Sequence, residues 1–291
     1  MNRLSIEKRA QILHLLVEGN SMRAATRIAN VSINTVTKLL VDVGAACREF
    51  QDEAIRNINS KRVQCDEIWS FCYAKDKNVA PEDKELLGHG DAYTWTAIDP
   101  DTKLAISWLV GRRDQDYAEA FIGDLASRLA GRIQLTTDGW GPYIGAVEKV
   151  FAGAIDFAML VKVYEGENAK GQRRYSPAKF LKAEKRRING NPDVDEVSTS
   201  YVERQNLNMR MSMRRFTRLT NGFSKKIENL EHAVSLHFMY YNFGRVHKTL
   251  RVTPAMEAGI ADHIWTLEEI AGLVKEEEPK KRGPYKKNNS N

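Results

Sequence analysis

The chain has little of several features that would assign it to a protein class at once. It contains three cysteines and no CxxC pair, which argues against a structural zinc site and a disulfide framework. No apolar run reaches the roughly 18 residues of a membrane span, and the start, MNRLSIEKRAQ, lacks the apolar core of a signal peptide. There is also no GxxxxGK[ST] phosphate loop. We therefore expect a cytoplasmic protein with reduced thiols, no membrane partner and no nucleoside triphosphate.

Positive charge is in excess. The 291 residues include 44 Lys and Arg against 38 Asp and Glu, a formal net charge of +6 at pH 7. This balance favours a polyanionic partner, although many enzymes are as basic without one. Hydrophobic residues make up 42% and charged residues 28%, as in ordinary globular proteins. The length suffices for two domains with one sizeable core.

Residues 1–50 predict an all-α domain of three short helices. An apolar stripe runs along residues 5–18, Ser21 caps a second helix, and Ser32 or Asn34 caps a third that ends at Gly44. This arrangement resembles a helix-turn-helix domain, whose last helix would enter the major groove of double-stranded DNA. The side chains presented to the bases would be Asn34, Thr35, Thr37 and Lys38. The alternative is a helical cap with no role in DNA binding.

A charged linker helix over 51–61 precedes a change of periodicity. Five β-rich runs follow, at residues 63–73, 92–98, 104–110, 133–137 and 157–163. Helical patterns lie at 115–129 and 142–151, and another helix contains Glu203. This order predicts an α/β fold, a ribonuclease-H-like mixed five-stranded sheet with flanking helices, over residues 62–250.

Three further segments are predicted from composition. Residues 165–200 are polar and charged and are interpreted as an insertion in the α/β domain. Residues 251–275 form a C-terminal helical extension. Residues 276–291 form a basic, low-complexity tail that we expect to be disordered.

Two aspartates stand in strand-like surroundings. Asp66 lies in the middle of the run VQCDEIWSFCY, and Asp138 ends a strand just before Gly139. A charge in an apolar strand is costly unless it is paired or bound to metal. If the two strands are parallel neighbours, their carboxylates lie side by side and repel each other, and a divalent cation removes that repulsion. Glu67, the next residue, should point to the opposite face of the sheet.

A third acid, Glu203, lies in the motif SxxYVERxNxxxRxxMRR over 198–215. Helical spacing places it on one side with Arg210 and Arg214, next to an apolar stripe. An acid among arginines is usually a solvated, salt-bridged face, but the two upstream aspartates favour a shared site. Carboxylate ligands alone suit Mg²⁺ or Mn²⁺ rather than Zn²⁺, and two such ions can clamp a phosphodiester.

Three motifs together resemble a known family. DEIW at 66–69, TDGW at 137–140 and YVERQNLNMR at 201–210 are similar to the DDE transposases of bacterial insertion sequences. The insertion-sequence-one group, which has a SFSK-like segment after the glutamate helix, is the most similar, and GFSKK at 222–226 matches that segment. The resemblance implies Asp66, Asp138 and Glu203 as metal-binding catalytic residues, with Arg210 near the DNA of the element ends.

The resemblance also implies an activity and a partner. Such enzymes hydrolyse a phosphodiester at each element end, and the freed 3′-hydroxyl then attacks target DNA. We expect a homodimer, because two ends must be held together, acting on nucleoid DNA in a bacterial cytoplasm. Founding members carry a cysteine zinc finger before the helix-turn-helix, and this chain does not. The alternatives are a structure-specific nuclease on the same fold and a non-enzymatic DNA-binding regulator.

Overall fold

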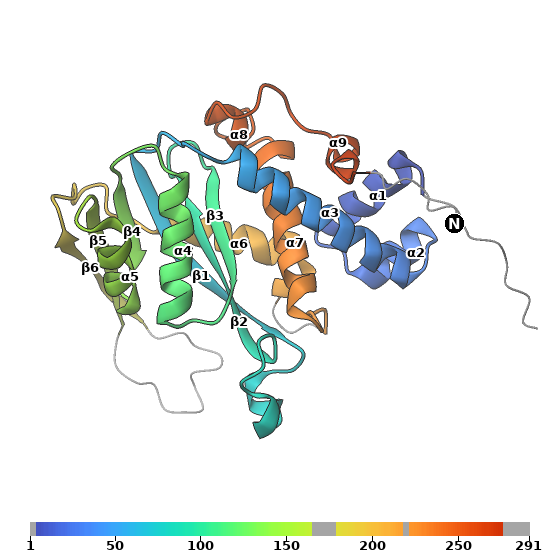
Figure 1. Ribbon diagram of the computed structural model, residues 1–291, viewed down its shortest axis with the longest axis horizontal. Coiled ribbons are helices and arrows are strands. Elements are labelled where there is room, and N and C mark those ends of the chain that lie inside the picture. Colours follow the sequence, from blue (N-terminus) through green and yellow to red (C-terminus); the bar gives the residue numbers. More distant parts are fainter. Residues whose placement is uncertain (1–3, 165–178, 218–220, 276–291) are drawn as a thin grey trace, which may run out of the picture.

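The computed structural model describes residues 4–164, 179–217 and 221–275, which form a mixed α/β fold (Figure 1). Its centre is a six-stranded sheet in the order β3-β2-β1-β4-β5-β6. The strands are β1 (Arg62–Cys72), β2 (Gly90–Ile98), β3 (Ala105–Gly111), β4 (Gln134–Asp138), β5 (Asp156–Tyr164) and β6 (Phe180–Asn189).

Helices precede, separate and follow the strands. They are α1 (Ile6–Val17), α2 (Met22–Ala29), α3 (Ile33–Ala54), α4 (Gln115–Arg128), α5 (Pro142–Phe151), α6 (Ser200–Ser212), α7 (Ile227–Met239), α8 (Pro254–Glu257) and α9 (Leu267–Gly272). The predicted C-terminal helical extension therefore contains two short helices rather than one continuous helix. None of the helices in the described ranges is long and apolar enough to cross a membrane.

The two predicted acidic strands are parallel neighbours. Strand β1 pairs antiparallel with β2 and parallel with β4, and β4 pairs parallel with β5. The last pair between β1 and β4 joins Gln64 to Thr136, two residues before Asp66 and Asp138. Both aspartates therefore lie at the same level, where the paired part of the two strands ends.

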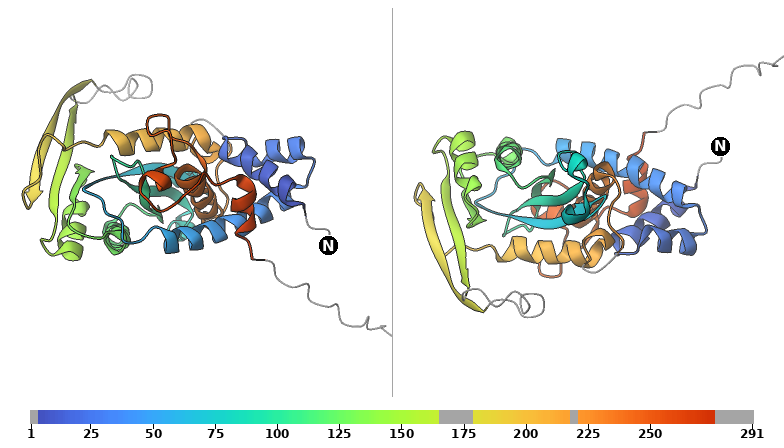
Figure 2. Two further views of the ribbon diagram at one scale, coloured as in Figure 1. Left: turned by 90° about the horizontal axis from the view of Figure 1, so that it is seen from above. Right: turned by 90° about the horizontal axis from the view of Figure 1, so that it is seen from below.

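The sheet is covered on both faces (Figure 2). On one face Trp95 of β2 is fully buried against the rings of Phe121 in α4 and Tyr143 in α5. On the other face Gln64 of β1 accepts hydrogen bonds from the first turn of α6. Helix α7 lies on this same face, since Trp108 of β3 stacks on a ring of α7. The Glu203 helix is thus on the face opposite α4 and α5.

Helices α1, α2 and α3 begin where the sequence predicts, and Ser32 caps α3 by accepting a hydrogen bond from the backbone of Thr35. However, α3 does not end at Gly44 but continues to Ala54, and the chain leaves the helix before the predicted linker helix of 51–61 is complete. At Gly44 an added Cβ would lie 2.6 Å from the Cβ of His232. The glycine therefore allows α3 to cross α7 closely, and packing overrides its weak helix propensity.

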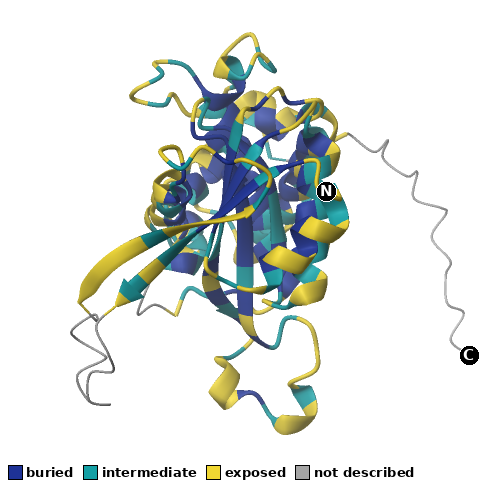
Figure 3. Ribbon diagram, turned by 90° about the vertical axis from the view of Figure 1, so that its left-hand side faces the viewer, coloured by how far each residue is buried: buried dark blue, intermediate teal, exposed yellow. Residues whose placement is uncertain are grey.

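The predicted insertion contributes a sixth strand to a sheet that was predicted to have five. Strand β6 pairs antiparallel with β5, and its side chains are largely exposed (Figure 3). The sequence FLKAEKRRIN has no alternation of apolar and polar residues, because neither face of this strand is buried. Residues 165–178 of the insertion and the basic tail of 276–291 lie outside the described residues.

Candidate metal centre

Three carboxylates converge where β1 and β4 stop pairing. One oxygen from each of Asp66, Glu67 and Asp138 lies within 4.8 Å of the others. Glu67 lies on the opposite face from Asp66, as predicted, and is level with Trp95 in register. Its carboxylate nevertheless belongs to the group. Asp138 ends its strand beyond the last β1–β4 pair, so its carboxylate can approach side chains from both faces.

Burial makes two of these acids hard to ionise. Burial, together with the nearby charges of Asp138 and Glu203, raises the pKa of Asp66 to about 6. Burial also raises the pKa of Glu67, whose side chain is 1% exposed, to about 8. A bound cation would remove this penalty by stabilising the charged carboxylates.

Two side chains hold the acids in place from outside the group. Asn206 of α6 donates its Nδ2 hydrogen to Asp66 Oδ2 at 2.9 Å. Arg113, between β3 and α4, lies 3.3 Å from Glu67 and 3.5 Å from Asp138 and is 4.6 Å from the ring centre of Trp140. The guanidinium is thus a counter-ion for the two acids on its side.

Glu203 lies near this group but outside it. Its carboxylate accepts hydrogen bonds from Lys162 of β5 and Thr199 before α6. The charge of Glu203 still raises the pKa of Asp66, whereas the charge of Lys162 lowers the pKa of Asp66. The structure thus brings Asp66 and Asp138 together with Glu67, while Glu203 is ion-paired with Lys162.

The residues present fit a divalent cation. The converging ligands are all carboxylate oxygens, which Mg²⁺ and Mn²⁺ prefer. In addition, the buried Oδ1 of Asn206, next to Asp66, has no hydrogen-bond partner among the described residues. An amide oxygen in that position can accept a hydrogen bond from a metal-bound water.

The residues predicted to contact DNA lie apart from the acids. On α3, Asn34 and Lys38 are exposed, and Lys38 pairs with Asp42 at 2.7 Å. The Thr37 hydroxyl donates to the carbonyl of Ile33, and Thr35 is held by the cap of the helix. Arg210 is half-buried on α6, whereas Arg214 is exposed in a short 3₁₀ turn, because α6 ends at Ser212.

Sequence reasoning missed three residues near the site. Strand alternation placed Glu67 on the opposite face of the sheet from Asp66, although its position next to Asp66 in the sequence could have indicated a shared site. Lys162 interrupts the apolar strand FAMLVKVY, and a lysine there could have been suspected of facing an acid. Arg113 follows a strand in a polar stretch and carries no local signal that separates it from a solvated arginine.

Comparisons with known proteins add little to this geometry. No family model matches the sequence, and no curated protein matches it. Among solved structures, the chain is similar to a chain of the "Crystal structure of the Mos1 Strand Transfer Complex". The identity is 10%, the TM-score is 0.25, and the match covers 96% of this chain and 81% of the other. At that TM-score the similarity establishes neither the fold family nor the activity of this chain.

Proposed function

We propose that this protein is a metal-dependent DNA transposase that cleaves the ends of an insertion sequence and joins them to target DNA. The observation that carries the proposal is the convergence of Asp66, Glu67 and Asp138 at the ends of two parallel strands. The resemblance of the three acidic motifs to the DDE transposases supports it from the sequence.

Asp66 and Asp138 hold the cations in this proposal, and Glu203 joins them once its carboxylate leaves Lys162. Mg²⁺ or Mn²⁺, when bound as a pair, supplies Lewis-acid activation of a phosphodiester and of the attacking oxygen. Asn206 orients the Asp66 carboxylate through its hydrogen bond. Arg113 and Lys162 reduce the repulsion among the acids.

DNA recognition is divided between two regions. Contacts to phosphates position a protein on DNA, and contacts to base edges read the sequence. We assign sequence reading to the start of α3, where Asn34, Thr35, Thr37 and Lys38 lie. Arg210 and Arg214 lie on or just after the helix of Glu203, and we assign them to phosphates near the cleavage point. A homodimer would hold the two element ends.

The test uses the full chain, Mg²⁺ and duplexes taken from the DNA that flanks this gene, with a plasmid as target. Hydrolysed ends and joined products are measured separately. The wild-type protein should form both, and Asp66→Asn, Asp138→Asn and Glu203→Gln should form neither. Asp116→Asn, which changes an exposed acid in the first turn of α4, is the matched control and should form both.

Two results would overturn the proposal. Hydrolysis without any joining on correct end DNA would favour the nuclease on the same fold. Cleavage retained by the Asp66→Asn protein would remove the metal centre from the chemistry.

A further inference from the structure

A cavity of about 900 Å³ opens between the N-terminal helices and the segment that follows α6. One side is formed by the turn before α2 and the first residues of that helix, 20–23, together with Ile33 at the start of α3. The other side is formed by residues 213–215 and 221–223 and by Lys225. The cavity thus lies apart from the carboxylates, between the helix proposed to read bases and the helix that carries Glu203.

The lining of this cavity is positively charged. Four cationic side chains contribute to it, and no aspartate or glutamate does so among the residues that the structure describes. The cations are Arg23, Arg214, Arg215 and Lys225. His237 also lines the cavity, but burial lowers its pKa to about 3, so that it is neutral at physiological pH. A surface hollow with charge of one sign attracts ions of the other sign.

Arg215 is a cation whose described partners are all neutral. Its Nε donates to the hydroxyl of Ser224 at 2.7 Å, and its Nη2 lies 3.4 Å from the sulfur of Met22. Both partners are neutral, and no carboxylate in the described ranges forms an ion pair with this half-buried guanidinium. Burial lowers the pKa of Arg215 to about 10. A desolvated cation without an anion is costly, so a stable protein normally supplies a partner.

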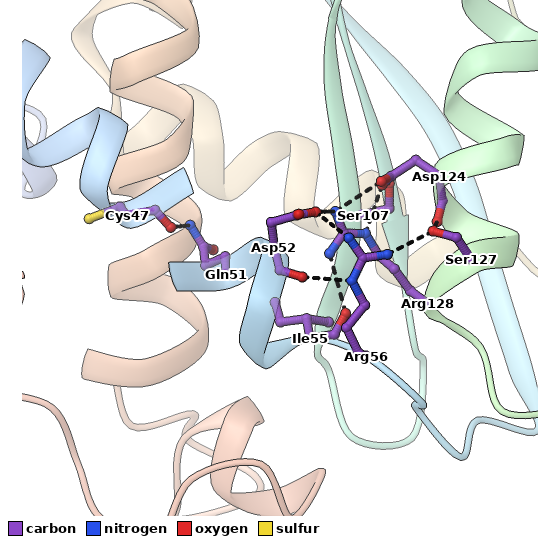
Figure 4. Close-up of polar contacts among 9 residues, drawn as sticks. All are labelled: Cys47, Gln51, Asp52, Ile55, Arg56, Ser107, Asp124, Ser127 and Arg128. Carbon is purple, nitrogen blue, oxygen red and sulfur yellow. Dashed lines mark hydrogen bonds and ion pairs between the residues drawn. The ribbon is translucent and has the colours of Figure 1, made fainter. Parts of the chain in front are cut away.

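Arg128 shows how the same chain neutralises a buried arginine (Figure 4). Its Nε and Nη2 donate to Asp124 and Asp52, each at 2.7 Å, and its Nη1 donates to the carbonyl of Ile55 at 3.2 Å. Every side of this guanidinium therefore has an acceptor. Arg215, by contrast, has only neutral partners among the described residues.

The surroundings of the cavity favour a phosphate group. The start of α2, with its positive helix end, lines the cavity, and helix N-termini bind phosphates. Arginine binds a phosphate through two parallel hydrogen bonds. The turn before α2 also packs closely on the helix of Glu203. At Gly19, in the turn before α2, an added Cβ would lie 2.7 Å from the carbonyl oxygen of Met211 at the end of α6.

We propose that this cavity binds the phosphodiester backbone of DNA, with Arg215 as its central contact and Arg23, Arg214 and Lys225 around it. This inference rests on the proposed function for the identity of the DNA. Its occupant is a strand rather than a free ion, because the cavity is far larger than one phosphate and adjoins the start of α3. The backbone would then join the N-terminal helices to the helix of Glu203.

The test measures duplex binding by fluorescence anisotropy in EDTA, together with the melting temperature, for the full chain. Arg215→Met should bind DNA about tenfold or more weakly, with a salt slope reduced by about one. Its melting temperature should stay the same or rise, because an uncompensated charge is removed. Arg128→Met is the matched control. It should melt at a lower temperature, since Asp124 loses its ion-pair partner and Asp52 loses one of two, and it should bind DNA normally while folded.

A second variant tests the same cavity if Arg215→Met fails to fold. The exposed pair Arg23→Gln and Lys225→Gln should weaken DNA binding without changing the melting temperature. Wild-type affinity in Arg215→Met, or in the double variant where Arg215→Met does not fold, would overturn the inference. Stabilisation by inorganic phosphate that does not compete with DNA would also overturn it.

The two proposals can fail separately. Binding in EDTA does not depend on cleavage chemistry, so loss of binding in Arg215→Met supports the cavity even if no joined product forms. Conversely, an active transposase with unchanged binding in Arg215→Met would refute only the cavity.

Discussion

Replacing Glu67 by glutamine tests the electrostatics of the carboxylate group. Glutamine has nearly the same shape as glutamate but carries no charge, so the change isolates the cost of ionising this side chain. Burial raises the pKa of Glu67 to about 8 in the folded protein, against an ordinary value of 4.5. Between these two pH values the folded state binds more protons than the unfolded state, and stability falls as pH rises.

The magnitude follows from this linkage. For wild-type protein without metal, the penalty is about 1.4 kcal/mol at pH 5.5 and about 4.4 kcal/mol at pH 8, using 1.36 kcal/mol for each pKa unit. The Glu67→Gln protein has no carboxylate at this position and pays neither penalty. Its stability advantage over wild type should therefore grow by about 3 kcal/mol from pH 5.5 to pH 8.

Urea unfolding in EDTA, followed by tryptophan fluorescence, measures this difference at the two pH values. The Asp116→Asn protein, which changes an exposed acid, should track wild type at both. An advantage of Glu67→Gln that is the same at pH 5.5 and pH 8 would refute the reasoning. It would mean that Glu67 ionises in the folded protein as an ordinary glutamate does.

Two other changes test separate parts of the structure. Lys162 forms an ion pair with Glu203, and its charge lowers the pKa of Asp66. Lys162→Gln removes this competing cation, so Mn²⁺ should bind more tightly in isothermal titration calorimetry. Weaker binding would show that Lys162 does not compete with the metal. Gly44→Ala places a methyl group 2.6 Å from a carbon of His232, and the overpacking should cost about 1–3 kcal/mol of stability in urea. An unchanged unfolding midpoint would contradict the close crossing of α3 and α7.

Local pattern was sufficient for most of the elements. Strands β1 and β4 were predicted at 63–73 and 133–137, and they lie within one residue of those bounds, so their positions follow from the sequence alone. The predicted site required these two strands to be parallel neighbours. They are, and their register places Asp66 and Asp138 level with each other. Ser32 was predicted as one of two caps of α3, and its side chain accepts the capping hydrogen bond.

Features that depend on distant contacts could not be predicted in this way. Gly44 looks like a helix end until His232 of α7 is placed against it. Strand β6 has no buried face, so it carries no periodic signal. Glu67 joins the acids because Asp138 ends its strand beyond the paired region, which alternation along β1 alone does not reveal.

Anomalous diffraction from crystals soaked in Mn²⁺ at pH 8 tests the central claim most directly, because it locates the metal without assuming an activity. The account predicts manganese bound by the carboxylates of Asp66 and Asp138, with Glu203 turned from Lys162 towards the metal. Manganese held by other residues, or no manganese at these carboxylates at a saturating concentration, would contradict it.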